Sequence, residues 1–213
     1  VKADDDHLFC RIIPGDNRAE RLFPAMHETL EEAGISPRDI RSLGAGRGPG
    51  AFTGVRNAVM AAKTFSQALG IPLYAPTTLE ILARGAVHGD LVVPLIDARR
   101  REVYCAVWAR EEGGMVPLRP PEVVSPAEVA GLIESSKDGR GAEVVLVGTG
   151  AEAYRELLAP LGTIMPDARP QPAALWEACR RAMLAGETES PMELLPLYLR
   201  QPDVGERRAK EGT

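Results

Sequence analysis

The sequence predicts an α/β chain with mixed sheets, built in two halves. Short apolar runs typical of strands alternate with longer stretches of helical periodicity. Two of these runs, residues 91–96 and 102–109, are close enough in sequence to pair as a hairpin, and no repeat of solenoid length is present. We place the seam near His88-Gly89-Asp90, which gives domains at 1–89 and 90–203, followed by a frayed polar tail at 204–213.

The composition is that of an ordinary globular protein. Of 213 residues, 45% are hydrophobic and 26% are charged, which argues against disorder. The formal net charge of −5 disfavours stable RNA binding by this chain alone, because RNA-binding domains usually carry a basic excess. Cys10, Cys105 and Cys179 are far apart and form no CxxC pair, which favours a reducing cytoplasm. The apolar runs are too short to cross a bilayer.

The opening of the chain reads as a hairpin. Asp4-Asp5-Asp6 lies between two short apolar runs and predicts the turn, with His7–Ile13 after it. On this interpretation Val1 is the tail of a strand whose beginning is absent, so we expect the first strand of the fold to be missing.

Two amphipathic helices are expected in the first half. In the first, residues 17–33, Asn17 is a plausible N-cap and Glu20 completes a capping box, whereas Pro24 predicts a kink. The second, residues 54–69, has an apolar stripe and ends at Gly70. The stripes either simply cover the sheet or include a second face buried against a partner.

The remaining elements follow from shorter signals. Thr77 or Thr78 caps a helix that ends near Ala86, and Pro126 suits the first turn of another. Strands are expected at 40–45, 71–74, 91–96, 102–109 and 144–147, further helices at 125–135, from 151 and at 172–185, and an extended segment at 194–203.

The stretch Gly46-Arg-Gly-Pro-Gly-Ala-Phe-Thr-Gly54 is the most unusual in the chain. Four glycines and a proline in nine residues exclude a regular element. Between a strand and a helix, such a loop either aims backbone N–H groups at an anion or makes a tight connection with close packing. It lacks the Gly-Lys-Ser/Thr of a Walker A loop and only half resembles a dinucleotide fingerprint. Three interpretations are open for Arg56, which follows the loop. Its side chain contacts a phosphate, pairs with a carboxylate across an interface, or is solvated on the helix surface.

Other candidate groups have ordinary interpretations. The three histidines stand at no metal-ligand spacing, so no metal site is predicted. Asp97 ends a buried strand. A carboxylate in this position can hold a metal, act as a base or form ion pairs with nearby arginines, and we favour ion pairing with Arg99–Arg101. No GxSxG motif supports a nucleophilic serine. The cysteines are expected to be buried, inert thiols.

The stretch from Gly46 to Arg56 resembles the GRGPGSFTGLR signature of the TsaB family, also called YeaZ. These are bacterial accessory proteins for making threonylcarbamoyladenosine in tRNA. The resemblance spans roughly residues 17 to 203. Other stretches similar to the family are Glu20-Arg-Leu-Phe-Pro24, Ala68-Leu-Gly-Ile-Pro72, Pro94-Leu-Ile-Asp-Ala-Arg-Arg100, Gly148-Thr-Gly-Ala151 and Pro196-Leu-Tyr-Leu-Arg200.

The resemblance implies an actin-like ATPase (ASKHA) fold with two ribonuclease-H-like domains of mixed sheets. It also implies a non-catalytic paralogue of the catalytic subunit TsaD. TsaD binds metal through a His-Leu-Glu-Gly-His-type motif, and this chain has Thr77-Thr-Leu-Glu-Ile-Leu82 there, where a leucine cannot coordinate a metal. No metal or cofactor is therefore expected.

The partners that the resemblance implies are TsaD and, in the larger complex, the ATPase TsaE, with tRNA contacted only indirectly, no membrane, and a homodimer as a possible alternative. The docking face would lie on the helices at 17–33 and 54–69. The interface candidates are Leu22, Phe23, Met26, Val55, Arg56, Ala58, Ala61, Ala62 and Phe65. The loop that shapes the helix entry comprises Gly46, Arg47, Gly48, Pro49, Gly50, Phe52, Thr53 and Gly54.

Two other classes of function stay open. The first is an actin-like ATPase or kinase that uses the glycine-rich loop, although its phosphate loop and a clear base are not found in the sequence. The second is a glycoprotease-like peptidase, for which the sequence offers neither a metal nor a nucleophile constellation.

Overall fold

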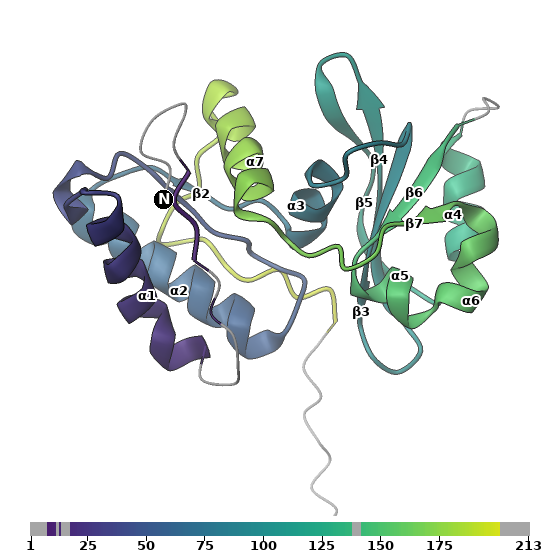
Figure 1. The fold of residues 1–213 in the computed structure, drawn as a ribbon, viewed down its shortest axis with the longest axis horizontal. Coiled ribbons are helices and arrows are strands. Elements are labelled where there is room, and N and C mark those ends of the chain that lie inside the picture. The colour runs from purple at the N-terminus through teal and green to yellow at the C-terminus, as the bar shows by residue number, and fades with distance from the viewer. Residues whose placement is uncertain (1–7, 12, 14–17, 138–141, 201–213) are drawn as a thin grey trace, which may run out of the picture.

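A computed structural model describes residues 8–11, 13, 18–137 and 142–200 of the chain. Two separate sheets are present in this part, one of two strands and one of five, and helices pack against both (Figure 1). The prediction of an α/β chain with mixed sheets is confirmed.

The smaller sheet has two strands, and the second long helix of the chain packs on it. Strands β1 (Leu43–Gly44) and β2 (Leu73–Tyr74) are parallel, with Leu43 opposite Leu73. Helices α1 (Arg18–Glu32) and α2 (Phe52–Leu69) run beside each other (Figure 1). A short 3-10 turn, Pro37–Asp39, follows α1, and α2 ends at Gly70, which has a φ of 65°. The core of this half comprises Ala45, Val59, Ala62, Leu73, Ala75 and Leu194.

The larger sheet has the order β5-β4-β3-β6-β7. The pairs β5–β4 and β4–β3 are antiparallel, whereas β3–β6 and β6–β7 are parallel, so the sheet is mixed. The hairpin predicted between residues 91–96 and 102–109 is confirmed. The strands are β3 (Leu91–Asp97), β4 (Val103–Glu111), β5 (Gly114–Val124), β6 (Val144–Val147) and β7 (Thr163–Ile164).

Helices cover both faces of this sheet, which explains why β3 is apolar at nearly every position. Alternate residues of a strand point to opposite faces, and Val93 and Leu95 pack with α4 (Val129–Ser136), α5 (Thr149–Ala153) and α6 (Arg155–Leu158). On the other face, Val92 packs with Leu79 and Leu82 of α3 (Thr78–Arg84).

Two helices join the two sheets. Helix α3 precedes the predicted boundary at residue 89 but packs on the larger sheet. Helix α7 (Pro172–Leu184) follows that boundary, yet it contacts α3, β1 and β2. Each of these helices therefore packs with elements from the opposite side of the boundary, which itself stays a prediction.

Several expectations need correction. Strand β5, which contains three prolines, and the two-residue β7 were not predicted. Helix α2 begins at Phe52, not Gly54, and α4 begins at Val129, after a turn at 126–128. Among the described residues of the run 7–13, Leu8 forms only an isolated bridge. The expected Asn17 cap, the Asp4–Asp6 turn and the tail at 204–213 lie outside the described residues.

The capping prediction for α3 is confirmed at Thr77, whose Oγ1 accepts the N–H of Glu80 at 3.0 Å. Within the described ranges, no helix combines the length and the apolar character needed to span a membrane.

Candidate functional site

The glycine-rich loop is a tightly packed connection between β1 and α2. The Ala45 N–H donates to the Tyr74 carbonyl and the Arg47 N–H to the Pro76 carbonyl, both at 3.0 Å. The Gly48 carbonyl in turn accepts the Thr78 N–H at 2.8 Å, and the Gly48–Pro49 peptide is cis. Of these donors the Arg47 N–H belongs to the loop, and it bonds to the protein's own backbone, which favours the packing interpretation over an anion cradle.

Three of the loop's glycines lie where an added side chain would crowd a neighbouring residue. A Cβ on Gly46 would lie 3.2 Å from Cδ1 of Ile81, and one on Gly50 would lie 3.3 Å from Cγ2 of Val55. Gly48 has φ 101°, which side-chain-bearing residues rarely adopt, and its Cβ would lie 3.0 Å from the Leu197 carbonyl oxygen. The motif therefore fixes how the chain enters α2.

Phe52, Thr53 and Gly54 belong to the first turn of α2, where the Val55 N–H donates to the Ala51 carbonyl at 3.0 Å. Gly54 was expected at the start of this helix, but Phe52 and Thr53 were expected in the loop, and that part of the prediction is wrong because the helix begins two residues earlier. No Cβ clash holds position 54 as glycine.

A segment that we call the strap, residues 189–200, returns over this loop. The Leu197 N–H donates to the Arg47 carbonyl at 2.7 Å, and Nη1 of Arg47 lies 3.4 Å from Oε1 of Glu189. Along α2, Nζ of Lys63 donates to the Leu194 carbonyl at 2.8 Å. The strap thereby fixes both the loop and one side of α2.

The outer surface of α1 and α2 exposes large apolar side chains. Phe23 is 54% exposed, and its ring centroid lies 6.1 Å from that of Phe65 across the two helices. Phe52 is 52% exposed and stacks on Tyr198 of the strap at 5.4 Å, and Met60 is 53% exposed. Clustered apolar side chains on the surface are typical of interaction sites. We call five of the large apolar residues that are exposed on α1, α2 and the strap the exposed apolar cluster, namely Phe23, Phe52, Met60, Leu195 and Tyr198, of which Phe52 and Tyr198 are in contact.

The structure divides the predicted interface residues by exposure. Ala61 and Ala62 are each 8% exposed, so they are part of the chain's own packing and offer little surface to a partner. Phe23 and Arg56 are exposed. The half-buried members are Leu22, Met26, Val55, Ala58 and Phe65.

Met60, Leu195 and Tyr198 were missed by reasoning from the sequence. Met60 follows the exposed Arg56 by one helical turn, which is a usable signal. The strap offers no such periodicity.

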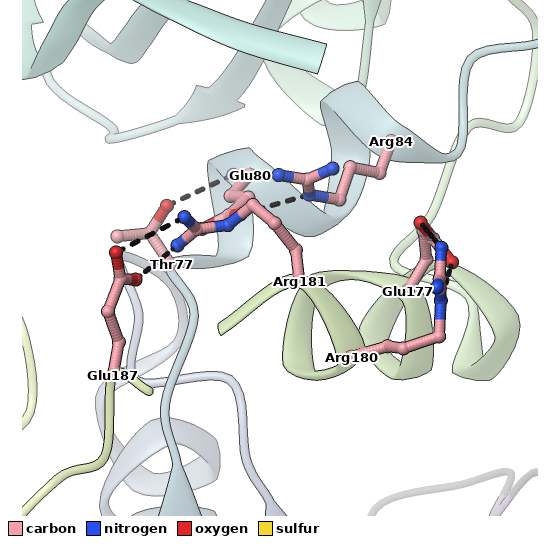
Figure 2. Close-up of polar contacts among 7 residues, drawn as sticks. All are labelled: Thr77, Glu80, Arg84, Glu177, Arg180, Arg181 and Glu187. Atoms are coloured by element: carbon pink, nitrogen blue, oxygen red, sulfur yellow. Dashed lines mark hydrogen bonds and ion pairs between the residues drawn. The ribbon is translucent and has the colours of Figure 1, made fainter. Parts of the chain in front are cut away.

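A polar cluster joins α3 to α7 (Figure 2). Oε1 of Glu80 accepts Nε of Arg84 at 2.9 Å, and Nε of Arg181 on α7 lies 3.9 Å from the same oxygen. The side chains of Glu80 and Arg84 are 12% and 5% exposed, and the Arg84 guanidinium lies 5.8 Å from the centre of the Trp108 ring. Thr77 and Glu80 lie in the segment that the resemblance aligns with the metal-binding motif of TsaD. In this chain Thr77 caps α3 and Glu80 pairs with Arg84, so both side chains stabilise the helix.

Asp97 pairs with its neighbouring arginine, as favoured. Its Oδ1 accepts the Arg99 N–H at 2.9 Å and its Oδ2 lies 3.4 Å from Arg99 Nη1. Across the portion of the chain that the structure describes, no group of three or more His, Cys, Asp or Glu side chains is arranged to hold a metal.

Two of the cysteines match the expected buried thiols. Burial raises the pKa of Cys105 and of Cys179 to about 12, so both stay protonated at neutral pH. Cys10 is exposed, and its prediction as a buried residue is wrong because residues 8–11 form no strand, with Leu8 making only an isolated bridge.

Two hollows lie between the first half of the chain and the segment that contains α7. The larger, about 700 Å³, is mainly apolar and lies between α1, β1 and α7. The smaller, about 300 Å³, is lined by Gly46, Gly54, Val55, Thr78 and Gln171 among others. Its lining contains no arginine or lysine, so it is poorly suited to phosphate.

Comparison with known proteins connects this geometry to one group of proteins. The family model of TsaD, tRNA N6-adenosine threonylcarbamoyltransferase, matches residues 13–194. The tRNA threonylcarbamoyladenosine biosynthesis protein TsaB of Escherichia coli is 33% identical, over 85% of this chain and 80% of that protein.

Two solved structures from Pseudomonas aeruginosa have the same fold. YeaZ superposes with a TM-score of 0.75 at 30% identity, covering 87% of each chain. An uncharacterized protein with similarity to peptidase YEAZ gives a TM-score of 0.77 at 32% identity, covering 85% of this chain and 84% of that one.

Proposed function

The chain belongs to the TsaB (YeaZ) family, and from this premise we propose that it acts in tRNA threonylcarbamoyladenosine biosynthesis as a non-catalytic activator of a TsaD-type subunit. The observation that carries the proposal is the exposed apolar cluster on α1, α2 and the strap. It offers a partner aromatic and thioether surface, the kind that dominates protein interfaces.

The glycine-rich loop supports this role indirectly. Its glycines set the entry into α2, and the strap bonds to the loop and packs Tyr198 on Phe52. The motif therefore shapes the docking face instead of holding a substrate. An ATPase that uses this loop gains no support, since the Arg47 N–H bonds to the Pro76 carbonyl and the lining of the neighbouring hollow lacks basic side chains.

The chemistry of the α3 segment favours a non-catalytic part. Thr77 caps the helix and Glu80 is paired with Arg84, so neither side chain is poised toward an open site. In the proposed assembly the TsaD-type subunit carries the transfer chemistry, a TsaE-type ATPase completes the complex, and the work is done in the cytoplasm.

The test is association in solution. The full chain is mixed with the TsaD-type subunit of the same organism, and the mass is measured by light scattering. We expect a one-to-one complex that Phe23→Asp or Met60→Asp weakens at least about tenfold, because each places a charge within an apolar contact. Leu157→Asp is the matched control: Leu157 is 52% exposed on α6, away from the cluster, and its substitution leaves association unchanged.

Each outcome bears on the proposal. A homodimer of this chain that uses the same cluster and is displaced by the TsaD-type subunit supports it. The absence of a complex at micromolar concentration contradicts it, as does equal weakening by Leu157→Asp. Circular dichroism of each variant verifies that it is folded.

A further inference from the structure

The tip of the β3–β4 hairpin has an unusual backbone. Arg99, Arg100 and Arg101 have φ angles of 62°, 54° and 60°, so three consecutive arginines adopt the left-handed conformation. Residues with a Cβ pay a steric penalty there, and runs of them are rare. Such a turn persists only where the surrounding structure enforces it, which is a common property of functional sites.

The enforcement comes from the base of the hairpin. The Ala98 N–H donates to the Glu102 carbonyl and the Glu102 N–H to the Arg99 carbonyl, both at 3.0 Å, which closes the turn. The Asp97 carboxylate accepts the Arg99 N–H, while the Asp97 N–H donates to Oγ1 of Thr149 at 3.2 Å.

The glycines beside Thr149 make this base rigid. A Cβ on Gly148 would collide with the Leu95 carbonyl oxygen, and one on Gly150 would lie 3.0 Å from the Leu95 carbonyl carbon. The start of α5 therefore packs directly against the end of β3. The Gly148-Thr-Gly150 stretch supports the hairpin from below.

The tip concentrates positive charge on an acidic chain. The Arg99 side chain is 88% exposed, and Arg100 and Arg101 are also exposed. Arg200 joins them from the strap, with Nη1 donating to the Ala98 carbonyl at 3.2 Å and an ion pair to Glu102. Four arginines thus gather at this tip, with Asp97 paired to Arg99 and Glu102 paired to Arg200, although the whole chain has a net charge of −5.

The arrangement of these side chains selects the kind of ligand. Successive residues of a helical turn project about 100° apart, so the three arginines spread outward. Neither hollow described above includes them. Guanidinium groups match phosphate oxygens, and a spread, open set suits phosphates distributed along a strand better than one small anion in a pocket.

We propose that the Arg99–Arg101 tip contacts the phosphate backbone of tRNA. This inference rests on the proposed function, which brings the chain near tRNA, and it adds a direct contact to that function. The contact is weak in the isolated chain, whose net charge opposes RNA, and gains strength in the complex, where the partner supplies further contacts.

The test measures binding of the full chain to a fluorescein-labelled, unmodified tRNA transcript by anisotropy over a salt series. The variant Arg99→Gly/Arg100→Gly/Arg101→Gly removes the charges and suits the left-handed backbone. We expect its affinity to fall at least about tenfold and the slope of log K against log salt to fall by about 2, as for the loss of two to three phosphate contacts. Its melting temperature is expected to be unchanged or higher, because glycine relieves the left-handed strain.

Two controls separate charge from structure. The corresponding triple lysine variant keeps the charge and is expected to bind within about threefold of the wild type. Arg38→Ala/Arg41→Ala removes two exposed arginines from the other half and has an equally small effect.

Three results would overturn the proposal: no binding of tRNA at low salt, unchanged binding by the triple glycine variant, or displacement of tRNA by ATP at constant ionic strength, which would assign the tip to a nucleotide. The light-scattering complex is measured on the same triple variant. Loss of that complex with intact tRNA binding would assign the tip to a protein partner, whereas an intact complex leaves the proposed function standing whatever the outcome with tRNA.

Discussion

The sulfur of Cys179 on α7 occupies the space that a side chain at Gly44 on β1 would need. A Cβ built on Gly44 collides with that Sγ and lies 3.7 Å from Cβ of Cys179. Because α7 also contacts α3, this contact helps to set the position of α7 between the two sheets. The absence of a side chain at Gly44 thus allows α7, which follows the larger sheet in sequence, to pack on the smaller sheet.

We therefore expect Gly44→Ala to destabilise the chain by about 1–3 kcal/mol, the usual cost of overpacking. Cys179→Ala frees the space and should recover most of the loss when combined with Gly44→Ala. Urea unfolding of the two single variants and the double variant measures the coupling. Additive effects of the two changes would show that the contact does not decide the packing.

The buried pair Glu80–Arg84 supplies the second prediction. Glu80→Ala leaves the 5%-exposed Arg84 side chain without its 2.9 Å partner and is expected to cost about 3 kcal/mol. Arg181→Ala is the matched control, because Arg181 is 46% exposed and lies 3.9 Å from Glu80, so its loss should cost under about 1 kcal/mol. Equal costs in urea unfolding would contradict the hierarchy inferred from burial.

The fold was predictable wherever pattern and burial coincide. Strand β3 is buried on both faces, so its sequence is a continuous apolar run. The start of α3 was predictable because Thr77 is a typical N-cap residue. Strand β5 was not predictable in the same way. It lies at an edge of the sheet, where Pro117, Pro120 and Pro121 are tolerated although they disrupt the usual signal of a strand.

The candidate site was predictable as a pair of helices but not residue by residue. Helical periodicity marks an apolar stripe without saying what covers it, so Ala61 and Ala62 were assigned to a partner although the chain buries them itself. The strap depends on contacts more than 100 residues apart, such as that between Lys63 and Leu194, separated by 131 positions. Contacts between residues so far apart in the chain cannot be predicted from local sequence patterns.

The buried thiols predict how stability depends on pH. Cys105 and Cys179 have an ordinary pKa of 9.0 and a folded-state pKa of about 12, so the folded chain retains protons that the unfolded chain releases. Their contribution to stability is complete below pH 9 and is lost as pH rises from 9 toward 12, by about 1.4 kcal/mol per thiol and pH unit. Urea unfolding between pH 8 and pH 11 (about one unit below and two above the ordinary pKa) measures this decline.

The double variant Cys105→Ala/Cys179→Ala should show a shallower decline over the same range, whereas Cys10→Ser, at an exposed position, should leave it unchanged. Alkylation at pH 8 gives an independent readout: only Cys10 is expected to react in the folded chain, since the other two thiols are buried and protonated. Rapid alkylation of all three would contradict the burial.

Arg110 holds the connection between α3 and β3. Its Nη2 donates to the Ala86 carbonyl at 2.7 Å and its Nε to the Gly89 carbonyl at 3.2 Å, so one guanidinium spans both ends of the turn. Lysine keeps the charge but presents a single ammonium that does not reproduce this fork. We expect Arg110→Lys to cost about 1–2 kcal/mol and to speed amide exchange at residues 86–90, measured by mass spectrometry. Arg155→Lys, where an exposed arginine pairs with Glu152 within the same helical region, is the control and should change neither. Unchanged exchange in Arg110→Lys would mean that packing of α3 on the sheet fixes the turn without the guanidinium.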